Sequence, residues 1–259
     1  IIPSKSLMIF NDTKVLPSKL NGVFVKNGHP VEILLIRKTN DEKFWESLIK
    51  GLGKLKSGAE MEFGNGELKA ILEKRLEDKA ILKLIYKGSL DSILNRIGKM
   101  PLPPYIKRSI IDNEAITHHD RERYQTMFAK HPGAIAAPTA GLHFTPNIIK
   151  SLTNHNINTT YLTLHVGVGT FQPIRTENVE EHKMQAEQFY LSKDTIGDIL
   201  KAKQSHRKIV GVGSTTTKVL ESIKLKNLKP EAKTGWTDRF IFPGHKFKLV
   251  DHMITNFHL

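Results

Sequence analysis

Four short stretches of the chain combine Gly, Thr, His and Pro with apolar neighbours, and these residue types point to ligand chemistry. The stretches are residues 98–106, 120–145, 164–187 and 211–218. Histidine can move a proton near neutral pH, and small residues ahead of a helix let backbone N–H groups approach an anion. Because such residues lower local stability, their clustering predicts sites shaped for ligands.

The first stretch is rich in proline. It reads Gly98-Lys99-Met100-Pro101-Leu102-Pro103-Pro104-Tyr105-Ile106, and its three prolines within four residues enforce an extended backbone. A nucleobase or adenine could stack on the aromatic face of Tyr105. A stiff linker between domains has the same composition, so both interpretations stay open.

The second stretch precedes a predicted helix start. Thr145 followed by Pro146 is typical of a first helical turn, with the threonine hydroxyl as the cap. The residues before it, 136–144, are mostly small, and His143 lies where it could titrate or bond to a ligand. A histidine flanked by leucine and phenylalanine is also compatible with a role inside the core.

The third stretch carries Gly-x-Gly after a predicted strand. Residues Leu164-His165-Val166-Gly167-Val168-Gly169 lead on to His182 and Glu187. Gly-x-Gly by itself is weak evidence for nucleotide binding. His182 and Glu187 lie five residues apart rather than the four of a helical metal pair, and no third ligand is obvious. We therefore predict no metal site.

The fourth stretch predicts a strand, a tight turn and a helix start rich in hydroxyls. It reads Gly211-Val212-Gly213-Ser214-Thr215-Thr216-Thr217-Lys218 and lacks the Gly-Lys-Ser/Thr order of a phosphate-binding P-loop. Its N–H groups and hydroxyls could hold a carboxylate or a phosphate. Plain capping of the helix would use the same residues.

Periodicity predicts the elements that position these stretches. Apolar runs at 7–10, 161–166, 209–212, 240–242 and 249–254 predict strands, and 194–204 predicts an amphipathic helix. This alternation favours an α/β domain with mostly parallel strand pairing. Between residues 22 and 87, alternating runs with turns at Asn27-Gly28, Asn40-Asp41 and Asn65-Gly66 favour a small antiparallel β-barrel. We predict a discontinuous main domain, residues 1–20 and 89–259, with a barrel domain inserted at 21–88.

Composition narrows the class of protein. The formal charge of +13 predicts attraction to a polyanion such as nucleic acid, although a generally basic proteome or solubility would also produce it. The chain has no cysteine, which excludes disulfides and thiolate metal sites and fits a cytoplasmic protein. No apolar run approaches the roughly 18 residues of a membrane span, and no signal peptide is recognisable. Neither end resembles a natural terminus, so we expect flanking segments.

Taken together, the motifs resemble one family, the S-adenosylmethionine:tRNA ribosyltransferase-isomerases of queuosine biosynthesis. The resemblance spans nearly the whole chain, in family order. Its matching pieces are Asn11-Asp12-Thr13-Lys14-Val15, Pro101-Leu102-Pro103-Pro104-Tyr105-Ile106, Tyr124-Gln125-Thr126, Ala137-Pro138-Thr139-Ala140-Gly141-Leu142-His143-Phe144, Leu164-His165-Val166-Gly167, Gly169-Thr170-Phe171 and Thr255-Asn256-Phe257-His258-Leu259.

The resemblance implies a three-layer α/β/α domain with an inserted antiparallel β-barrel, in agreement with the periodicity. It implies transfer and isomerisation of the ribosyl moiety of S-adenosylmethionine onto 7-aminomethyl-7-deazaguanine at the tRNA wobble position. The products would be epoxyqueuosine-tRNA, adenine and methionine. The implied partners are tRNA and S-adenosylmethionine, which is a consumed co-substrate. No resident cofactor, metal, membrane or obligatory protein partner is expected.

Site residues follow from the same resemblance. The catalytic candidates are expected around the reacting ribose, and they are His143, His165, Glu187 and Asp238. The substrate-binding candidates would line the pocket, present backbone amides, stack on a base or hold the methionine carboxylate; they are Asp12, Thr13, Tyr105, Thr139, Gly141, Phe144, Gly167, Gly169, Thr215, Thr216, Thr217 and Lys218.

Three positions depart from the family pattern. Gln185 stands where His is usual, Ala186 where Ser is frequent, and Lys218 where Arg is usual. Glutamine cannot shuttle a proton near neutral pH, and lysine loses the bidentate recognition of a carboxylate. The alternative functions are an S-adenosylmethionine-dependent RNA methyltransferase and a non-catalytic RNA-binding protein. Of the three functions, only the ribosyltransferase-isomerase reaction predicts release of adenine.

Overall fold

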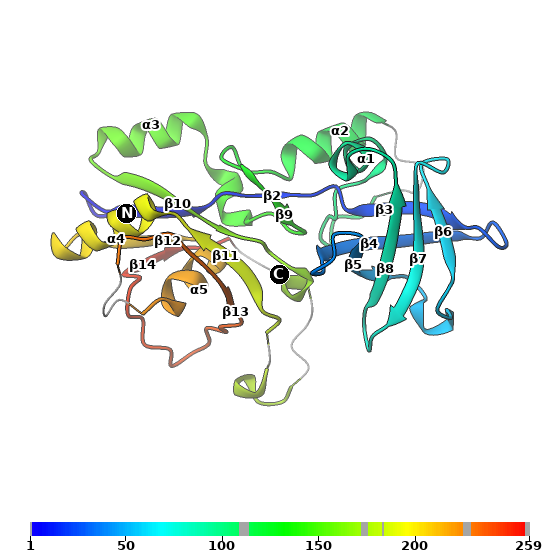
Figure 1. Ribbon diagram of the computed structural model, residues 1–259. Helices are drawn as coiled ribbons and strands as arrows, with labels where there is room; N and C mark the ends of the chain where they lie inside the picture. Colours follow the sequence, from blue (N-terminus) through cyan, green and yellow to red (C-terminus); the bar gives the residue numbers. More distant parts are fainter. Residues whose placement is uncertain (1, 109–113, 172–175, 183, 225–228, 257–259) are drawn as a thin grey trace. The chain divides into compact units, whose positions relative to one another are not determined.

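The computed structural model describes residues 2–108, 114–171, 176–182, 184–224 and 229–256 (Figure 1). The chain divides into two compact units. One unit joins Ile1–Val15 to Arg123–Leu259, and the other comprises Leu16–Glu122. No helix among the described residues is long and apolar enough to cross a membrane.

A six-stranded mixed sheet organises the first unit. Its order is β13 (Lys233–Thr237), β11 (Glu187–Leu191), β10 (Asn158–Leu164), β1 (Leu7–Asn11), β12 (Ile209–Val212) and β14 (His252–Ile254). The four strands β10, β1, β12 and β14 are parallel, and β11 is antiparallel to both of its neighbours. The predicted mostly parallel pairing is therefore confirmed for the centre of the sheet.

Helices cover both faces of this sheet. Side chains along a strand alternate between the two faces, so each face offers side chains for a helix to pack on. Met8 and Phe10 share a core with Leu152 of α3 (Pro146–Asn154). Thr160 faces the other side, where its hydroxyl donates to Thr195 of α4 (Lys193–Gln204) at 3.3 Å. Helix α5 (Ser214–Ser222) contacts β12, β1, β10 and β13. The α/β/α class is thereby confirmed.

Short elements complete the unit. The two-stranded parallel sheet pairs β2 (Thr13–Val15) with β9 (His131–Ala134). Three 3-10 turns follow, which are η2 (Thr139–His143), η3 (Val168–Phe171) and η4 (Val179–Glu181).

Local signals predicted several elements of this unit correctly. Thr145 caps α3, because its hydroxyl accepts the N–H of Ile148 at 3.3 Å, and Pro146 opens the helix. The predicted helix at 194–204 is α4. The predicted strand at 240–242 is wrong, since the rings of Phe240 and Phe242 pack against each other outside any strand.

The predicted strand at 249–254 forms only over its last three residues, as β14. The N–H groups of Leu249 and Val250 donate to the carboxylate of Glu221, at 3.0 and 2.9 Å. Because these two N–H groups donate to the Glu221 side chain, they do not donate to a neighbouring strand.

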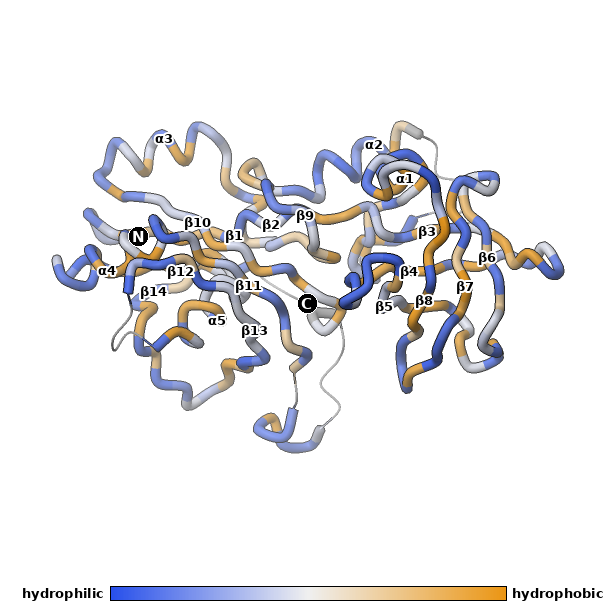
Figure 2. The backbone as a smooth tube through the Cα atoms, in the orientation of Figure 1, coloured by the Kyte–Doolittle hydropathy of each residue, from blue (hydrophilic) through white to orange (hydrophobic). Residues whose placement is uncertain are grey.

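A closed antiparallel barrel forms the second unit. Its strands in order are β3 (Lys19–Phe24), β4 (Pro30–Lys38), β5 (Phe44–Ile49), β8 (Ala80–Tyr86), β7 (Leu68–Arg75) and β6 (Glu60–Phe63). Hydropathy alternates along these strands (Figure 2), so that inward side chains such as Leu20 and Phe63 build the core. The three predicted turns join β3 to β4, β4 to β5 and β6 to β7, which confirms the barrel.

The barrel unit also contains residues outside the six barrel strands. The short turn η1 (Leu52–Lys54) and helix α1 (Leu90–Ile97) contribute Leu52, Leu90 and Leu94 to the barrel core. Lys19 and Lys99 pair as an isolated antiparallel bridge. Helix α2 (Glu114–Arg123) follows. The observed unit, residues 16–122, thus extends beyond the predicted 21–88 because chain on both sides of the barrel packs on it.

Candidate active site at one edge of the sheet

One end of each of the six strands of the mixed sheet lies at the same edge, and predicted site residues lie at or next to several of these ends. The parallel strands β1, β10, β12 and β14 end at Asn11, Leu164, Val212 and Ile254. Strand β11 runs the opposite way, so that its first residue, Glu187, lies at this edge and pairs with Thr237, the last residue of β13. The carboxyl ends of parallel strands are where α/β proteins usually bind ligands.

Asn11 fixes the chain where β1 and β10 separate. Its side-chain amide donates to the carbonyl oxygen of Leu164 at 3.0 Å, and its carbonyl oxygen accepts the N–H groups of Leu164 (3.0 Å) and Thr13 (3.1 Å). Asn11 is 1% exposed, so these bonds are shielded from water. They set the positions of the two residues that follow it, Asp12 and Thr13.

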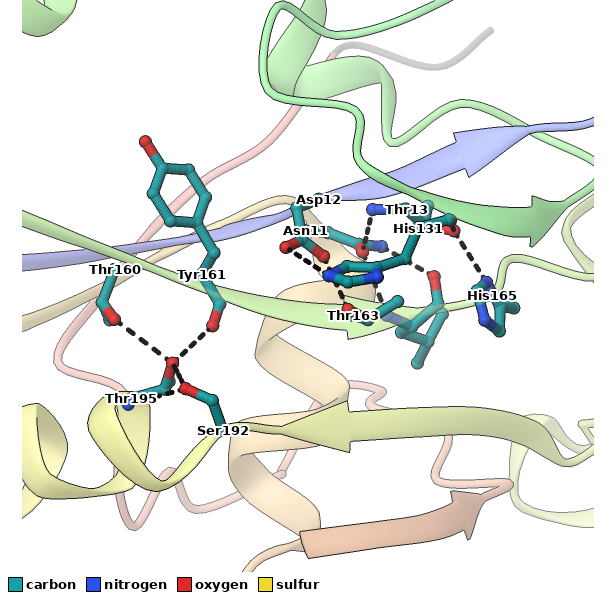
Figure 3. A network of polar contacts seen from close by, with 11 residues as sticks. Asn11, Asp12, Thr13, His131, Thr160, Tyr161, Thr163, His165, Ser192 and Thr195 are labelled. Carbon is teal, nitrogen blue, oxygen red and sulfur yellow. Dashed lines mark hydrogen bonds and ion pairs between the residues drawn. The ribbon is translucent and has the colours of Figure 1, made fainter. Parts of the chain in front are cut away.

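Asp12 combines burial with two polar partners (Figure 3). The hydroxyl of Thr163 donates to its Oδ1 at 2.6 Å, and His131 Nε2 lies 3.6 Å from its Oδ2. Burial raises the pKa of Asp12 above its usual value, although Thr163 and the positive charges of His131 and Lys130 oppose the rise. A carboxyl group with a raised pKa beside an imidazole can hold or relay a proton.

His165 is held by Thr13 on one side and packed against Gly133 on the other. Its Nδ1 lies 2.9 Å from Thr13 Oγ1 (Figure 3), and a Cβ on Gly133 would stand 2.7 Å from the ring. Burial, followed by the nearby His131, lowers the pKa of His165. The imidazole is therefore neutral near pH 7, as a proton acceptor must be.

Glu187 and Lys218, which we predicted separately as catalytic and substrate-binding, contact each other. The ammonium group of Lys218 binds Glu187 Oε2, and Glu187 Oε1 accepts the N–H of Gly167 at 2.8 Å. The two residues are only 5% and 7% exposed. This pair ties β11 and α5 to the loop after β10, two residues beyond His165.

The first turn of α5 presents buried hydroxyls at the same edge. The helix begins after Gly213, whose φ of +92° suits glycine, without a side-chain cap. Thr217 donates to the carbonyl oxygen of Gly213 at 3.1 Å. The buried hydroxyls of Thr215 and Thr216 have no hydrogen-bond partner among the described residues. Unpaired hydroxyls and free helical N–H groups together suit an anion.

The second stretch reaches this edge through two contacts. His143 Nε2 lies 3.0 Å from Asn256 Oδ1, just beyond the end of β14. Ala140 lies beside Gly213, because a Cβ added to Gly213 would stand 3.8 Å from the Cβ of Ala140. Gly141 permits close packing, since a Cβ there would stand 2.9 Å from Thr126. Thr139 and Phe144 are half-buried on either side of this turn.

The remaining predicted residues are spread more widely. Asp238 is exposed and follows the last residue of β13. Gly169 lies near Gln185, because a Cβ added to Gly169 would stand 3.7 Å from the Cβ of Gln185. Tyr105 belongs to the other unit and is 71% exposed. No group of three or more His, Asp or Glu side chains that could hold a metal ion occurs in the described part of the chain.

Sequence reasoning missed His131 and the role of Asn256. His131 lies at the start of β9, opposite Thr13, and its N–H bonds to the carbonyl oxygen of Asp12 at 3.2 Å. The only available signal was His-Pro-Gly at 131–133, in which a histidine precedes two residues that break regular structure.

Comparison with known proteins gives one consistent result. The family model described as "Queuosine biosynthesis protein" matches residues 1–259. The S-adenosylmethionine:tRNA ribosyltransferase-isomerase of Halothermothrix orenii is 42% identical over 254 residues, covering 98% of this chain and 72% of that protein. The protein of the same name from Acetivibrio thermocellus is 43% identical over 253 residues, with 97% and 72% covered.

One solved structure is also similar. It is an S-adenosylmethionine tRNA ribosyltransferase from Thermotoga maritima, 26% identical, and the match covers 100% of this chain and 69% of that one. Its TM-score is 0.42.

Proposed function

Because the chain belongs to the queuosine biosynthesis family of S-adenosylmethionine:tRNA ribosyltransferase-isomerases, we propose that it catalyses the reaction that names the family. It transfers and isomerises the ribosyl moiety of S-adenosylmethionine onto 7-aminomethyl-7-deazaguanine at the wobble position of tRNA. The products are epoxyqueuosine-tRNA, adenine and methionine.

The observation that carries this proposal is identity of 42% spread over 98% of the chain. A match of this extent includes both units and every stretch at the sheet edge. It favours the transferase over the alternatives, an RNA methyltransferase and a non-catalytic RNA-binding protein. The +13 charge suits a tRNA substrate, because phosphate neutralisation by Lys and Arg dominates affinity for nucleic acid.

The reaction asks for three kinds of group. A base must remove a proton from the ribose carbon beside the sulfonium, a donor must protonate departing adenine, and polar groups must hold the methionine portion. S-adenosylmethionine itself supplies the ribosyl unit as a consumed co-substrate. The proposal needs no resident cofactor or metal and no partner other than tRNA.

His165 is the general base in this proposal. The Thr13 hydroxyl donates to the carbonyl oxygen of His131 at 3.5 Å, so its oxygen accepts the N–H at His165 Nδ1. This tautomer leaves the lone pair on Nε2. A pKa lowered by burial keeps the ring neutral and ready to accept the ribose proton.

Asp12 and His131 form the proton-donating pair. Burial raises the pKa of Asp12, and the 3.6 Å approach of His131 gives its carboxyl group a neighbour that can exchange a proton. His131 is the more exposed member of this pair, since its side chain is 45% exposed and that of Asp12 is 13% exposed. His131 thus protonates adenine, and Asp12 orients the imidazole.

Glu187 and Lys218 act by positioning. Each neutralises the other, and the carboxylate also holds Gly167, so Glu187 anchors the loop that carries His165. Thr215 and Thr216 bind the methionine carboxylate through their hydroxyls and the first N–H groups of α5. His143 orients ligand groups together with Asn256.

The decisive experiment incubates the protein with S-adenosylmethionine and tRNA carrying 7-aminomethyl-7-deazaguanine, followed by mass spectrometry of nucleosides and small molecules. Epoxyqueuosine with equal adenine and methionine supports the proposal. Methylated RNA with S-adenosylhomocysteine would refute it in favour of a methyltransferase. Tight tRNA binding without any product would support a binding protein.

The variants His165→Gln and His131→Gln test the assigned roles. Both retain hydrogen bonding but lose proton transfer, so turnover should fall by about 10²–10⁴-fold with folding preserved. Full turnover in either variant would remove that histidine from the mechanism.

A further inference from the structure

The barrel unit contains a pocket outside the edge of the mixed sheet. Its volume is about 690 Å³, within the range typical of small-molecule sites. The outward side chains of β3 and β4, including Lys19, Asn21 and Glu32, form one wall. The proline-rich stretch forms another through residues 99, 100, 102–104 and 106, and α2 closes the pocket with Thr117 and Asp120. The proline-rich stretch therefore lines a cavity.

The lining carries more positive than negative charge. The ammonium group of Lys19 binds Glu32 at 2.9 Å, and Arg108 binds Asp120 at 2.6 Å. Within the described ranges, neither Lys50 nor Lys99 pairs with a carboxylate, although both line the pocket. Lys50 and Lys99 are thus available to bind an anion.

One of these cations lies in a costly position. Lys99 is directly opposite Lys19, with backbone bonds of 2.8 and 3.2 Å between the two residues. Like charges directly opposite on neighbouring strands destabilise the pair. Glu32 offsets the charge of Lys19 but not that of Lys99. An anion bound between Lys99 and Lys50 would relieve this repulsion.

The rest of the lining is apolar and stiff. Met100, Leu102, Pro103 and Ile106 contribute the apolar walls. Tyr105, which lies between the lining residues Pro104 and Ile106, is 71% exposed and offers a ring for stacking. The exposed amide of Asn21 can both donate to and accept from a base edge. An aromatic ring beside a positively charged groove is the combination that binds unpaired nucleotides.

We propose that this pocket binds an unpaired nucleotide of the RNA substrate, with its phosphate between Lys50 and Lys99 and its base against the proline-rich wall. The identity of the RNA rests on the proposed function. The occupant's chemistry, a flat base joined to a phosphate, rests on the pocket itself.

The test compares two double variants of the full chain. Lys50→Ala with Lys99→Ala removes the two unpaired cations of the pocket. The matched control, Lys69→Ala with Lys74→Ala, removes two exposed lysines of β7 that do not line it. Lys50, Lys69 and Lys74 are exposed and Lys99 is half-buried, so both proteins should fold, which circular dichroism verifies.

Adenine release gives KM for tRNA, KM for S-adenosylmethionine and kcat. The pocket variant should raise KM for tRNA about tenfold and leave the other two constants unchanged. The salt slope of tRNA binding should fall by about 2, roughly 1 for each lost phosphate contact. The control should change neither quantity. Equal effects of both double variants would overturn the proposal, because only non-specific charge would then matter.

Direct binding keeps this inference separate from the reaction. Fluorescence anisotropy with labelled tRNA reports the pocket even if the protein releases no adenine, an outcome that would refute the proposed function alone. Titration with guanosine 5′-monophosphate tests a free nucleotide as the occupant. Binding of the mononucleotide that requires Lys50 and Lys99, combined with unchanged tRNA binding, would overturn the assignment to RNA.

Discussion

The buried pair between Glu187 and Lys218 makes a prediction that the structure quantifies. The substitution Lys218→Met keeps the length of the side chain but removes its charge. Among the described residues, Glu187 then retains only the N–H of Gly167 as a partner, in a site where it is 5% exposed. A buried carboxylate without its counter-charge costs about 3–5 kcal/mol of stability.

The reverse change and the double variant complete a cycle. Glu187→Gln leaves the Lys218 ammonium unpaired and should cost a similar amount. The double variant buries no charge, and the side-chain amide oxygen introduced by Glu187→Gln would still accept from Gly167, so we expect a loss of only about 1 kcal/mol. The coupling between the two positions should therefore be several kcal/mol.

The two tryptophans allow each unit to be followed separately. Trp236 lies in β13 opposite Gln188, next to Glu187, whereas Trp45 lies in the barrel. With Trp45→Phe in every variant, fluorescence in urea reports the sheet unit through Trp236. Taking about 2 kcal/mol per molar urea as the slope, each single variant should shift the midpoint down by about 1.5–2.5 M.

The outcome that refutes this reasoning is specific. If Lys218→Met lowers the free energy of unfolding by less than about 1 kcal/mol, the pair is hydrated and neutralisation does not hold the loop after β10. If the single variants and the double variant lose the same stability, the two side chains do not compensate each other.

Three further predictions concern the same unit. The pKa of His165 is lowered, so its contribution to stability is present above about pH 6.5 and is lost as the pH falls through its pKa in the folded protein. The acid limb of kcat/KM should likewise lie below about pH 6.5. An acid limb above about pH 7 in the pH–rate profile would contradict the role of His165 as the base. Burial alone would raise the pKa of Glu221, but the N–H groups of residues 248–250 and His245 lower it overall, so Glu221→Gln should cost about 2–3 kcal/mol at pH 7. The substitution should also remove the loss of stability that we expect of the natural protein as the pH falls below about 4.3, and urea midpoints at pH 7 and pH 4 test both effects. Gly133→Ala places a Cβ 2.7 Å from the ring of His165 and should lower kcat at least tenfold without unfolding, whereas the control Gly197→Ala in α4, where a Cβ meets nothing within 4 Å, should leave kcat unchanged and raise thermal stability slightly.

Elements with local causes could be predicted from the sequence. Thr145 and Pro146 cap α3 with atoms that lie within three residues of one another. The turns at Asn27-Gly28 and Asn65-Gly66 reflect positive φ angles that these residues tolerate, at Gly28 (+69°), Asn65 (+54°) and Gly66 (+88°). The signals for these elements lie in adjacent residues, so tertiary packing did not alter them.

Predictions failed where side chains from distant residues took over backbone groups. The apolar residues at 249–250 are typical of a strand, yet Glu221 accepts their N–H groups. Phe240 and Phe242 suggested another strand, but their rings contact each other, and Phe240 also packs against His182. Such competition is invisible to periodicity because the competing group lies elsewhere in the chain.

The candidate site shows the same division. Motifs, together with the resemblance to a known family, singled out Asp12, His165, Glu187 and the Thr215–Thr217 run. Only strand order and register bring these residues to one edge of the sheet, because β11 runs antiparallel and thereby places its first residue beside the ends of its neighbours. Burial then decides their chemistry: it raises the pKa of Asp12, lowers that of His165, and pairs Lys218 with Glu187, 31 residues away. Local sequence has no measure of burial, and for that reason His131 became visible only in the folded protein.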